Sequence, residues 1–265
     1  MSTFALDGTD LYYEVDGDDG VAVLLIHGFA LDARMWDDQV AALKDAARVI
    51  RYDARGFGRS RRRDPDVTYT HAGDAWALLD QLGVDDAVIV GLSMGGRIAL
   101  ETTLADPERV RALVLIDAVL DGVRWDEKSN GEMAAVSAAM KADGLAAAKA
   151  TWLAHGFFAP AGRDPALAAR LAAMVEDFPG LHLSEPDPHG AHPAVIEELP
   201  SVAVPTTVIV GELDVPCFQE MADRLATGIP GACKVVVPDA GHMANMEAPD
   251  VVNHVLREVI EKAAP

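Results

Sequence analysis

The stretch Gly91-Leu92-Ser93-Met94-Gly95-Gly96 decides the fold of this chain. It follows a short β-branched run at 87–90 and precedes a helix-like stretch at 97–105. A serine between a strand and a helix sits on a sharp turn, and flanking glycines remove side chains that would clash there. The following helix offers a positive dipole end and free N–H groups. The pattern predicts a nucleophilic serine at Ser93; the alternative is a glycine-rich turn whose serine is incidental.

Strand-like and helix-like segments alternate on either side of this turn. The expected strands are residues 11–15, 21–26, 48–52, 87–90, 112–116, 206–210 and 233–237. The expected helices are residues 36–44, 71–82, 94–105, 218–227 and 248–262. The runs at 21–26 and 112–116 are apolar without alternation, which is typical of strands covered on both faces. The alternation predicts an α/β fold with a doubly wound, mostly parallel sheet.

The segment from 121 to 200 has a different composition. Alanine makes up 17 of the 40 residues from 134 to 173, and prolines follow at 179, 186, 188 and 193. Because alanine favours helices and no strand-like run appears, we expect two or three helices here. We predict that residues 121–200 form a small helical cap on a core of residues 1–120 and 201–265. Ordinary crossover helices are the alternative.

A serine hydroxyl becomes a good nucleophile only when a base takes its proton. His242 follows the expected strand 233–237 and comes last in the chain order serine, acid, histidine, which favours it over the other seven histidines. Asp214, after the expected strand 206–210, is the first choice for the acid that orients the imidazole. Asp117 also follows an expected strand, 112–116, and competes with Asp214 for this role.

The oxyanion of an acyl-transfer intermediate needs two N–H donors aimed at it. The backbone N–H of Met94, directly after the expected nucleophile, supplies one. The other is expected from the loop after 21–26, where His27-Gly28-Phe29 lies, and we assign it to the backbone N–H of Phe29. His27 is then expected to hold this loop by hydrogen bonding rather than to transfer protons.

Five motifs, taken together, resemble the α/β-hydrolase fold family. They are His27-Gly28-Phe29, the run 52–60 with sequence YDARGFGRS, the run 91–96 around Ser93, Gly211-Glu212-Leu213-Asp214, and Gly241-His242. The resemblance implies an eight-stranded, mostly parallel sheet, with a helical cap between strands six and seven. It also implies a serine, aspartate and histidine site without metal or organic cofactor.

Within that family the chain looks most like the 3-oxoadipate enol-lactonases and small carboxylesterases. The run 93–96, the short cap and the run 241–247 (GHMANME) support this comparison. Serine at 93 argues against the haloalkane dehalogenases and epoxide hydrolases, which use aspartate at this position. In the enol-lactonases a proline-rich loop often follows the acid. The corresponding run here is Asp214-Val215-Pro216-Cys217, so the match to that lactonase is loose.

Composition excludes several classes of protein. The 265 residues carry 42 acidic and 22 basic side chains, a net charge of −20, which disfavours nucleic acid and anionic membranes as partners. The two cysteines cannot form a disulfide framework, and no apolar run approaches the length of a membrane helix. We therefore expect a cytoplasmic enzyme with a small-molecule partner. The oligomeric state cannot be inferred from the sequence.

These features predict a serine hydrolase that cleaves a small carboxylic ester or lactone through an acyl-enzyme. Carbon–carbon bond hydrolysis, perhydrolysis or acyl transfer on the same residues are alternatives, as is a slow-turnover ligand receptor. Aromatic residues of the expected cap are candidates for the substrate pocket, with helix packing as the alternative: Trp125, Trp152, Phe157 and Phe158. The basic run 61–63 is either a solvated loop or a funnel for an anionic substrate.

Overall fold

The computed structural model describes residues 2–61, 64–185, 188–189 and 195–264. Its strands form one eight-stranded sheet, in the order β1-β2-β4-β3-β5-β6-β7-β8. They are β1 (Ser2–Leu6), β2 (Thr9–Asp16), β3 (Val21–Ile26), β4 (Ala47–Tyr52), β5 (Ala87–Leu92), β6 (Val110–Ile116), β7 (Thr206–Gly211) and β8 (Cys233–Val237). The pairs β1–β2 and β2–β4 are antiparallel, and all other neighbours are parallel. The mostly parallel α/β sheet predicted from the sequence is confirmed.

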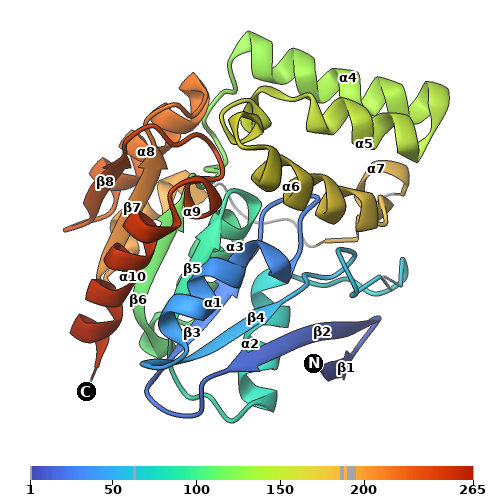
Figure 1. The fold of residues 1–265 in the computed structure, drawn as a ribbon. Helices are drawn as coiled ribbons and strands as arrows, with labels where there is room; N and C mark the ends of the chain where they lie inside the picture. The colour runs from blue at the N-terminus through green and yellow to red at the C-terminus, as the bar shows by residue number, and fades with distance from the viewer. Residues whose placement is uncertain (1, 62–63, 186–187, 190–194, 265) are drawn as a thin grey trace.

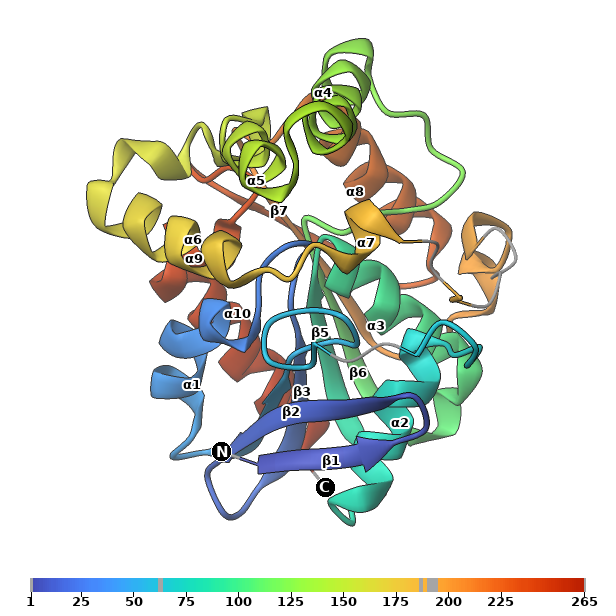
Figure 2. The same cartoon turned by 90° about the vertical axis from the view of Figure 1, so that its right-hand side faces the viewer.

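Helices cover both faces of the sheet (Figures 1 and 2). The α-helices of the described residues are α1 (Asp37–Leu43), α2 (His71–Gln81), α3 (Met94–Ala105), α4 (Glu127–Asp143), α5 (Leu145–Leu153), α6 (Pro165–Asp177), α7 (Leu181–Ser184), α8 (Pro216–Gly228), α9 (Ala244–Glu247) and α10 (Pro249–Ala263). The helices α1 and α10 contact each other on one face, and α2 and α3 contact each other on the other face. The central strands are therefore shielded from water on both sides, and β5 is buried along its whole length.

One strand, β1, was not expected. It lies at the edge of the sheet and pairs only with β2, and two of its five residues are half-buried while the other three are exposed. Because an edge strand buries little apolar surface, its sequence carries a weak hydrophobic signal. The turn of the hairpin that it forms with β2 lies beside the segment that follows β4, where the carbonyl of Asp7 accepts a hydrogen bond from Arg55.

The alanine-rich segment between β6 and β7 is helical, as expected. Its described residues form four α-helices, α4, α5, α6 and the single turn α7, where two or three were predicted. In Figure 1 these helices lie above the carboxyl end of the sheet. The division into a core of residues 1–120 and 201–265 and a cap of residues 121–200 stays a prediction.

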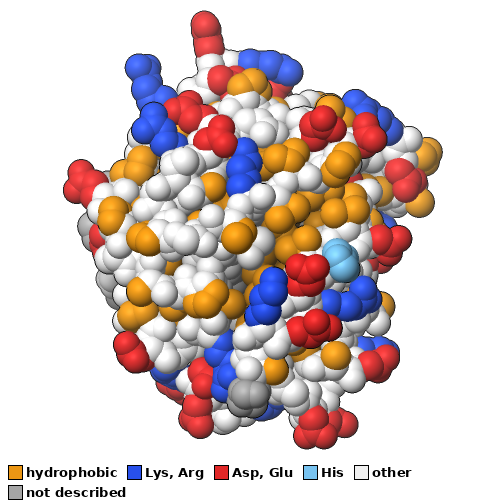
Figure 3. All heavy atoms as spheres, turned by 90° about the vertical axis from the view of Figure 1, so that its left-hand side faces the viewer, with side chains coloured by type: hydrophobic (Ala, Val, Ile, Leu, Met, Phe, Trp, Pro, Cys, Tyr) orange, Lys and Arg blue, Asp and Glu red, His pale blue; other side chains and the backbone are white. Residues whose placement is uncertain are grey.

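Charged side chains of both signs are interspersed on the face that carries β8 and α10, with hydrophobic side chains gathered between them (Figure 3). The net charge of −20 is therefore not concentrated in one acidic patch on this face. Among the described residues, no helix is both long enough and apolar enough to cross a membrane.

Candidate active site

Ser93 occupies a strained turn between β5 and α3. Its φ of +55° and ψ of −116° lie outside the regions that serine ordinarily adopts. The flanking glycines make this turn possible: a Cβ on Gly91 would lie 2.0 Å from the carbonyl oxygen of Gly95, and one on Gly95 would lie 2.1 Å from that of Ile26. The turn therefore brings Ser93 to the start of α3, where helix N–H groups are free.

His242 and Asp214 meet Ser93 at the carboxyl ends of the strands. His242 lies in the loop between β8 and α9, and its Nε2 is 2.9 Å from Ser93 Oγ. Its Nδ1 is 2.8 Å from Oδ2 of Asp214, which follows β7. All three residues are buried. A carboxylate at Nδ1 accepts the proton of that nitrogen, so Nε2 is left as the acceptor for the serine hydroxyl.

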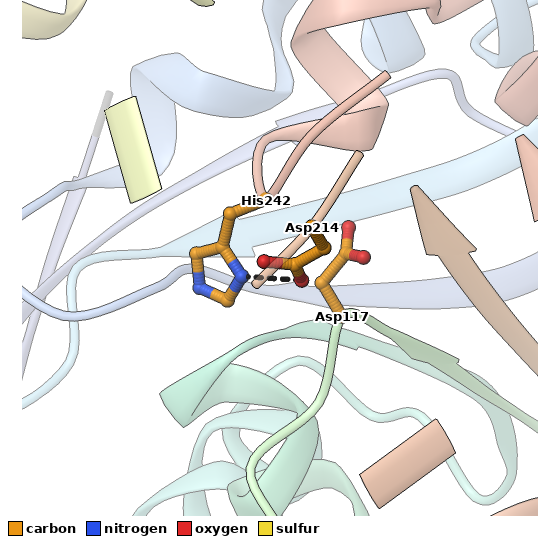
Figure 4. A group of neighbouring side chains, drawn as sticks. All are labelled: Asp117, Asp214 and His242. Carbon is orange, nitrogen blue, oxygen red and sulfur yellow. Dashed lines mark hydrogen bonds and ion pairs between the residues drawn. The ribbon is translucent and has the colours of Figure 1, made fainter. Parts of the chain in front are cut away.

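Asp117, the competing acid, lies beside this pair without bonding to the imidazole. An oxygen of Asp117, an oxygen of Asp214 and a ring nitrogen of His242 all fall within 4.8 Å of one another. Figure 4 shows Asp214 between the other two side chains, with its ion pair to His242. Because both ring nitrogens of His242 already have partners, this group does not form an open set of metal ligands.

Phe29 and Met94, the residues expected to supply oxyanion donors, lie beside Ser93. Among the described residues, none accepts a hydrogen bond from the N–H of Phe29 or of Met94, and both residues line one cavity with Ser93. Gly28 brings the Phe29 loop close, since a Cβ on Gly28 would lie 3.6 Å from Ser93 Cβ. Free donors at this position are what an oxyanion requires.

His27 anchors the loop that carries Phe29. Its Nε2 accepts the N–H of Ala54 at 2.9 Å, so Nδ1 carries the proton and donates to the carbonyl of Gly28 at 2.8 Å. Complete burial lowers the pKa of His27 below its usual value, which keeps the ring neutral. The hydrogen-bonding role expected for His27 agrees with this geometry.

A cavity of about 160 Å³ opens on Ser93. It is lined by Phe29, Ser93, Met94, Arg97, Val119, Trp125, Met133, Trp152 and Phe157. Three of the four aromatic candidates therefore reach the cavity. The fourth, Phe158, is buried and packs against Trp152 with ring centroids 5.5 Å apart, outside the lining.

Comparison with known proteins identifies the family. Residues 21–249 match the sequence profile of the family described as alpha/beta hydrolase fold. The chain belongs to the α/β hydrolase family. It is 33% identical over 256 residues, covering 93% of both chains, to a protein of Azorhizobium caulinodans that is provisionally named as the carbamate hydrolase RutD.

Two solved structures resemble this α/β hydrolase over nearly its whole length. One is a thermophilic esterase from Thermogutta terrifontis with malate bound, with 30% identity and a TM-score of 0.81 over 99% of this chain and 97% of the esterase. The other is the enol-lactonase from Burkholderia xenovorans LB400, with 26% identity and a TM-score of 0.81 over 98% of this chain and all of the lactonase. The prediction that this chain is an enzyme of the α/β hydrolase family is confirmed.

The basic run 61–63 of this α/β hydrolase is described only at Arg61, because residues 62 and 63 lie outside the described part of the chain. Arg61 Nε donates to the carbonyl of Gly58 at 3.1 Å. Arg61 lines a different cavity, together with Asp32 and Asp177, and is not part of the lining around Ser93. The described residue of this run thus gives the funnel hypothesis no support.

Three features of the site were missed from the sequence. Arg97 lines the cavity one helical turn after Ser93. Phe218 of α8 packs edge-on against His242, with ring centroids 4.2 Å apart. Glu247 accepts the N–H groups of Gly241 and Met243, at 2.9 and 3.0 Å, and so holds the histidine loop from behind. Only Arg97 had a sequence signal, since it stands four residues after the expected nucleophile and so on the same helix face.

Proposed function

We propose that this α/β hydrolase cleaves a small carboxylic ester or lactone through an acyl-enzyme on Ser93. The continuous chain of contacts from Ser93 Oγ to His242 Nε2, at 2.9 Å, and from His242 Nδ1 to Asp214, at 2.8 Å, carries this proposal. A base within hydrogen-bond distance, itself oriented by a carboxylate, is the arrangement that activates a serine hydroxyl.

The first half-reaction forms the acyl-enzyme. His242 Nε2 takes the hydroxyl proton as Ser93 Oγ attacks the substrate carbonyl, and the Asp214 carboxylate stabilises the resulting imidazolium. The backbone N–H groups of Phe29 and Met94 donate to the tetrahedral oxyanion. When the intermediate collapses, the carbon–oxygen bond to the leaving group breaks and His242 returns the proton to that oxygen.

The second half-reaction regenerates the enzyme. His242 removes a proton from a water molecule, which attacks the acyl carbonyl, and the same N–H groups stabilise the new oxyanion. The bond to Ser93 Oγ then breaks, Ser93 recovers its proton from His242, and the carboxylic acid leaves. A lactone follows the same steps, except that its alcohol stays attached to the acyl group.

The cavity suggests a short acyl group. Its volume of about 160 Å³ is below the roughly 300–1,000 Å³ typical of sites for drug-sized ligands. Its walls are apolar where they are formed by Trp125, Trp152 and Phe157. An ester of a small aliphatic acid is therefore the substrate that fits best. The names of the similar thermophilic esterase and enol-lactonase support esters and lactones as the substrate class.

Activity across p-nitrophenyl esters of increasing chain length, lactones of increasing ring size and a small carbamate tests this proposal. We expect short esters or lactones to turn over repeatedly, and Ser93→Ala to abolish turnover while leaving the melting temperature unchanged. A carbamate presents a similar carbonyl to Ser93 and is included because of the relative provisionally named as a carbamate hydrolase. A single acylation without a second turnover would support a receptor instead, and loss of a dienol chromophore with poor ester turnover would support carbon–carbon bond hydrolysis.

A further inference from the structure

Asp117 holds an unusual position for a residue outside the proposed proton-transfer chain. It directly follows β6, is fully buried, and has a φ of +43°, in the left-handed region. A non-glycine residue in that region costs about 1 kcal/mol or more, so surrounding contacts must maintain it. One of these is the hydrogen bond from the Asp117 N–H to the carbonyl of Ile209 in β7, at 2.9 Å.

The Asp117 carboxyl group bridges the two loops that carry the acid and the histidine. Its Oδ1 accepts the N–H of Gly211, the last residue of β7, at 2.8 Å. Its Oδ2 accepts the N–H of Ala244, the first residue of α9, at 3.4 Å. Gly211 lies three residues before Asp214, and Ala244 lies two residues after His242. One side chain therefore links the two segments whose relative position sets the distance between Asp214 and His242.

Two carboxyl groups this close in a buried site cannot both carry a charge without a large cost. The negative charge is better stabilised on Asp214, because Asp214 accepts the N–H of Val215 at 2.7 Å and pairs with His242, which becomes cationic during the proposed reaction. Among the described residues, Asp117 has no cationic partner. Burial, and then the neighbouring Asp214, raise the pKa of Asp117 well above its usual value.

The two hydrogen bonds of Asp117 differ in length in the way that a protonated carboxyl group predicts. A carbonyl oxygen is a better acceptor than a hydroxyl oxygen, which fits Oδ1 at 2.8 Å and Oδ2 at 3.4 Å. A proton on the Asp117 carboxyl group can then be donated to the Asp214 carboxylate, which has an oxygen within 4.8 Å of one of Asp117. The titratable groups around Asp117 are Asp214 and His242, with Glu247 behind the histidine loop.

We propose that Asp117 is a protonated positioning residue: it ties the Asp214 loop to the His242 loop and donates its own proton toward the Asp214 carboxylate. It acts through Asp214 and does not touch the substrate. This role rests on the proposed function of Ser93, His242 and Asp214. It also explains why a second aspartate at the end of a strand need not compete with Asp214 for the imidazole.

Asp117→Asn and Asp117→Ala test this role in the full-length enzyme with p-nitrophenyl acetate. Asparagine is neutral, keeps an acceptor for the Gly211 N–H and a donor for Asp214, and gives up only the longer contact with the Ala244 N–H, at 3.4 Å. We therefore expect kcat/KM within about threefold of the wild type and an unchanged acid limb of the pH profile. Alanine removes both loop contacts, so we expect kcat/KM to fall by about tenfold or more, together with a lower melting temperature. Rescue by asparagine but not by alanine is the expected pattern.

The pH profile also reveals the opposite result. If Asp117 carried a charge, Asp117→Asn would remove a negative charge near His242 and move the acid limb to lower pH. That shift, or an Asp117→Ala enzyme with wild-type kcat/KM, would overturn the proposal. Ser93→Ala in the same assay separates the two claims: turnover retained by Ser93→Ala refutes the proposed function, whereas an inactive Ser93→Ala with a shifted Asp117→Asn profile refutes only the role of Asp117.

Infrared difference spectroscopy detects the proton directly. At mildly alkaline pH, we expect a carbonyl-stretch band from a protonated carboxylic acid in the wild type, and its loss in Asp117→Asn. We expect Asp117→Asn to fold even if Asp117→Ala does not, because the amide has nearly the shape of the carboxyl group, so this measurement does not depend on the alanine variant. A wild-type spectrum without that band, or a band that persists in Asp117→Asn, would contradict the assignment.

Discussion

The phenyl ring of Phe157 stacks on the imidazole of His242, with ring centroids 4.4 Å apart and planes inclined by 28°. Phe157 belongs to the helical segment between β6 and β7, whereas His242 follows β8. The same phenyl ring also lines the cavity above Ser93. The helical segment therefore contacts both the proposed base and the space that the acyl group would occupy.

Phe157→Ala should change both the rate and the acyl preference. We expect kcat for short esters to fall by about one to two orders of magnitude, because the imidazole loses its packing on one face. We also expect the preference to move towards longer acyl chains, because a ring is removed from the cavity wall. Phe158→Ala is the matched control: it deletes a buried ring outside the cavity lining, so stability should fall without a change in chain-length preference. Equal preferences in both variants would contradict the assigned wall.

Gly95→Ala should prevent the turn at Ser93 from forming. The new Cβ would lie 2.1 Å from the carbonyl oxygen of Ile26 and 2.6 Å from that of His27. Relieving these clashes would require the backbone of β3 and of the loop after it to move. We expect a loss of several kcal/mol in the free energy of unfolding, measured by denaturant titration. Gly131→Ala is the control, since Gly131 is exposed in α4 with no atom within 4 Å of its Cβ. That change should be stabilising by about 0.5–1 kcal/mol.

Arg97→Gln should alter the response to substrate charge. Arg97 is the one charged side chain among the described residues that line the cavity. Its two ion pairs with described residues are long, with Nη1 3.4 Å from Asp121 and Nε 3.8 Å from Glu101. We expect kcat/KM for p-nitrophenyl hydrogen succinate, relative to the neutral butyrate ester, to fall by up to about fivefold. Arg224→Gln, on the exposed surface of α8, makes the same change in net charge away from the cavity. An identical ratio in both variants would show that Arg97 does not sense the acyl group.

Stability should fall as the pH drops below about 6.5. Burial, followed by the neighbouring His189, holds the pKa of His71 well below its ordinary value. A group with a lowered pKa in the folded state stabilises the protein above its unfolded pKa, and that stability is lost as pH falls because the unfolded chain binds the proton more readily. In denaturant titrations at several pH values, His71→Phe should therefore reduce the slope of the unfolding free energy against pH by at most about 1.4 kcal/mol per pH unit. His254→Gln removes a histidine from an exposed position in α10 and is the control for loss of a histidine that is not buried.

The sequence predicted the features that depend on local chemistry. The glycines around Ser93 predicted the strained turn, because a Cβ at Gly91 or Gly95 would lie about 2 Å from a backbone carbonyl oxygen and only glycine has no Cβ. The order of strands and helices predicted the sheet that gathers Ser93, Asp214 and His242 at one edge. Chain order alone could not separate Asp214 from Asp117, since both follow strands. Only the side-chain distances pair Asp214 with His242.

The features that the sequence could not predict depend on contacts between distant segments. Phe157 and Phe158 are adjacent and chemically identical, yet only Phe157 faces the cavity, because a short 3-10 turn at Gly156–Phe158 sets the direction of each ring. Phe218 supports His242 by packing, which leaves no motif. Glu247 ends the run 241–247, but the sequence does not show that its carboxylate accepts the N–H groups of Gly241 and Met243. Edge strand β1 was missed because its few half-buried residues resemble those of a loop.

The central claim is that Ser93 is the nucleophile, and acylation of that residue tests it most directly. The enzyme is mixed with a slowly deacylating p-nitrophenyl ester, quenched during the first turnover and analysed by intact-mass and peptide mass spectrometry. The account predicts a burst of about one p-nitrophenol per enzyme, one acyl group on the peptide that contains Ser93, and neither signal in Ser93→Ala. An acyl group on another residue, or a Ser93→Ala enzyme that hydrolyses the ester at the wild-type rate, would contradict it.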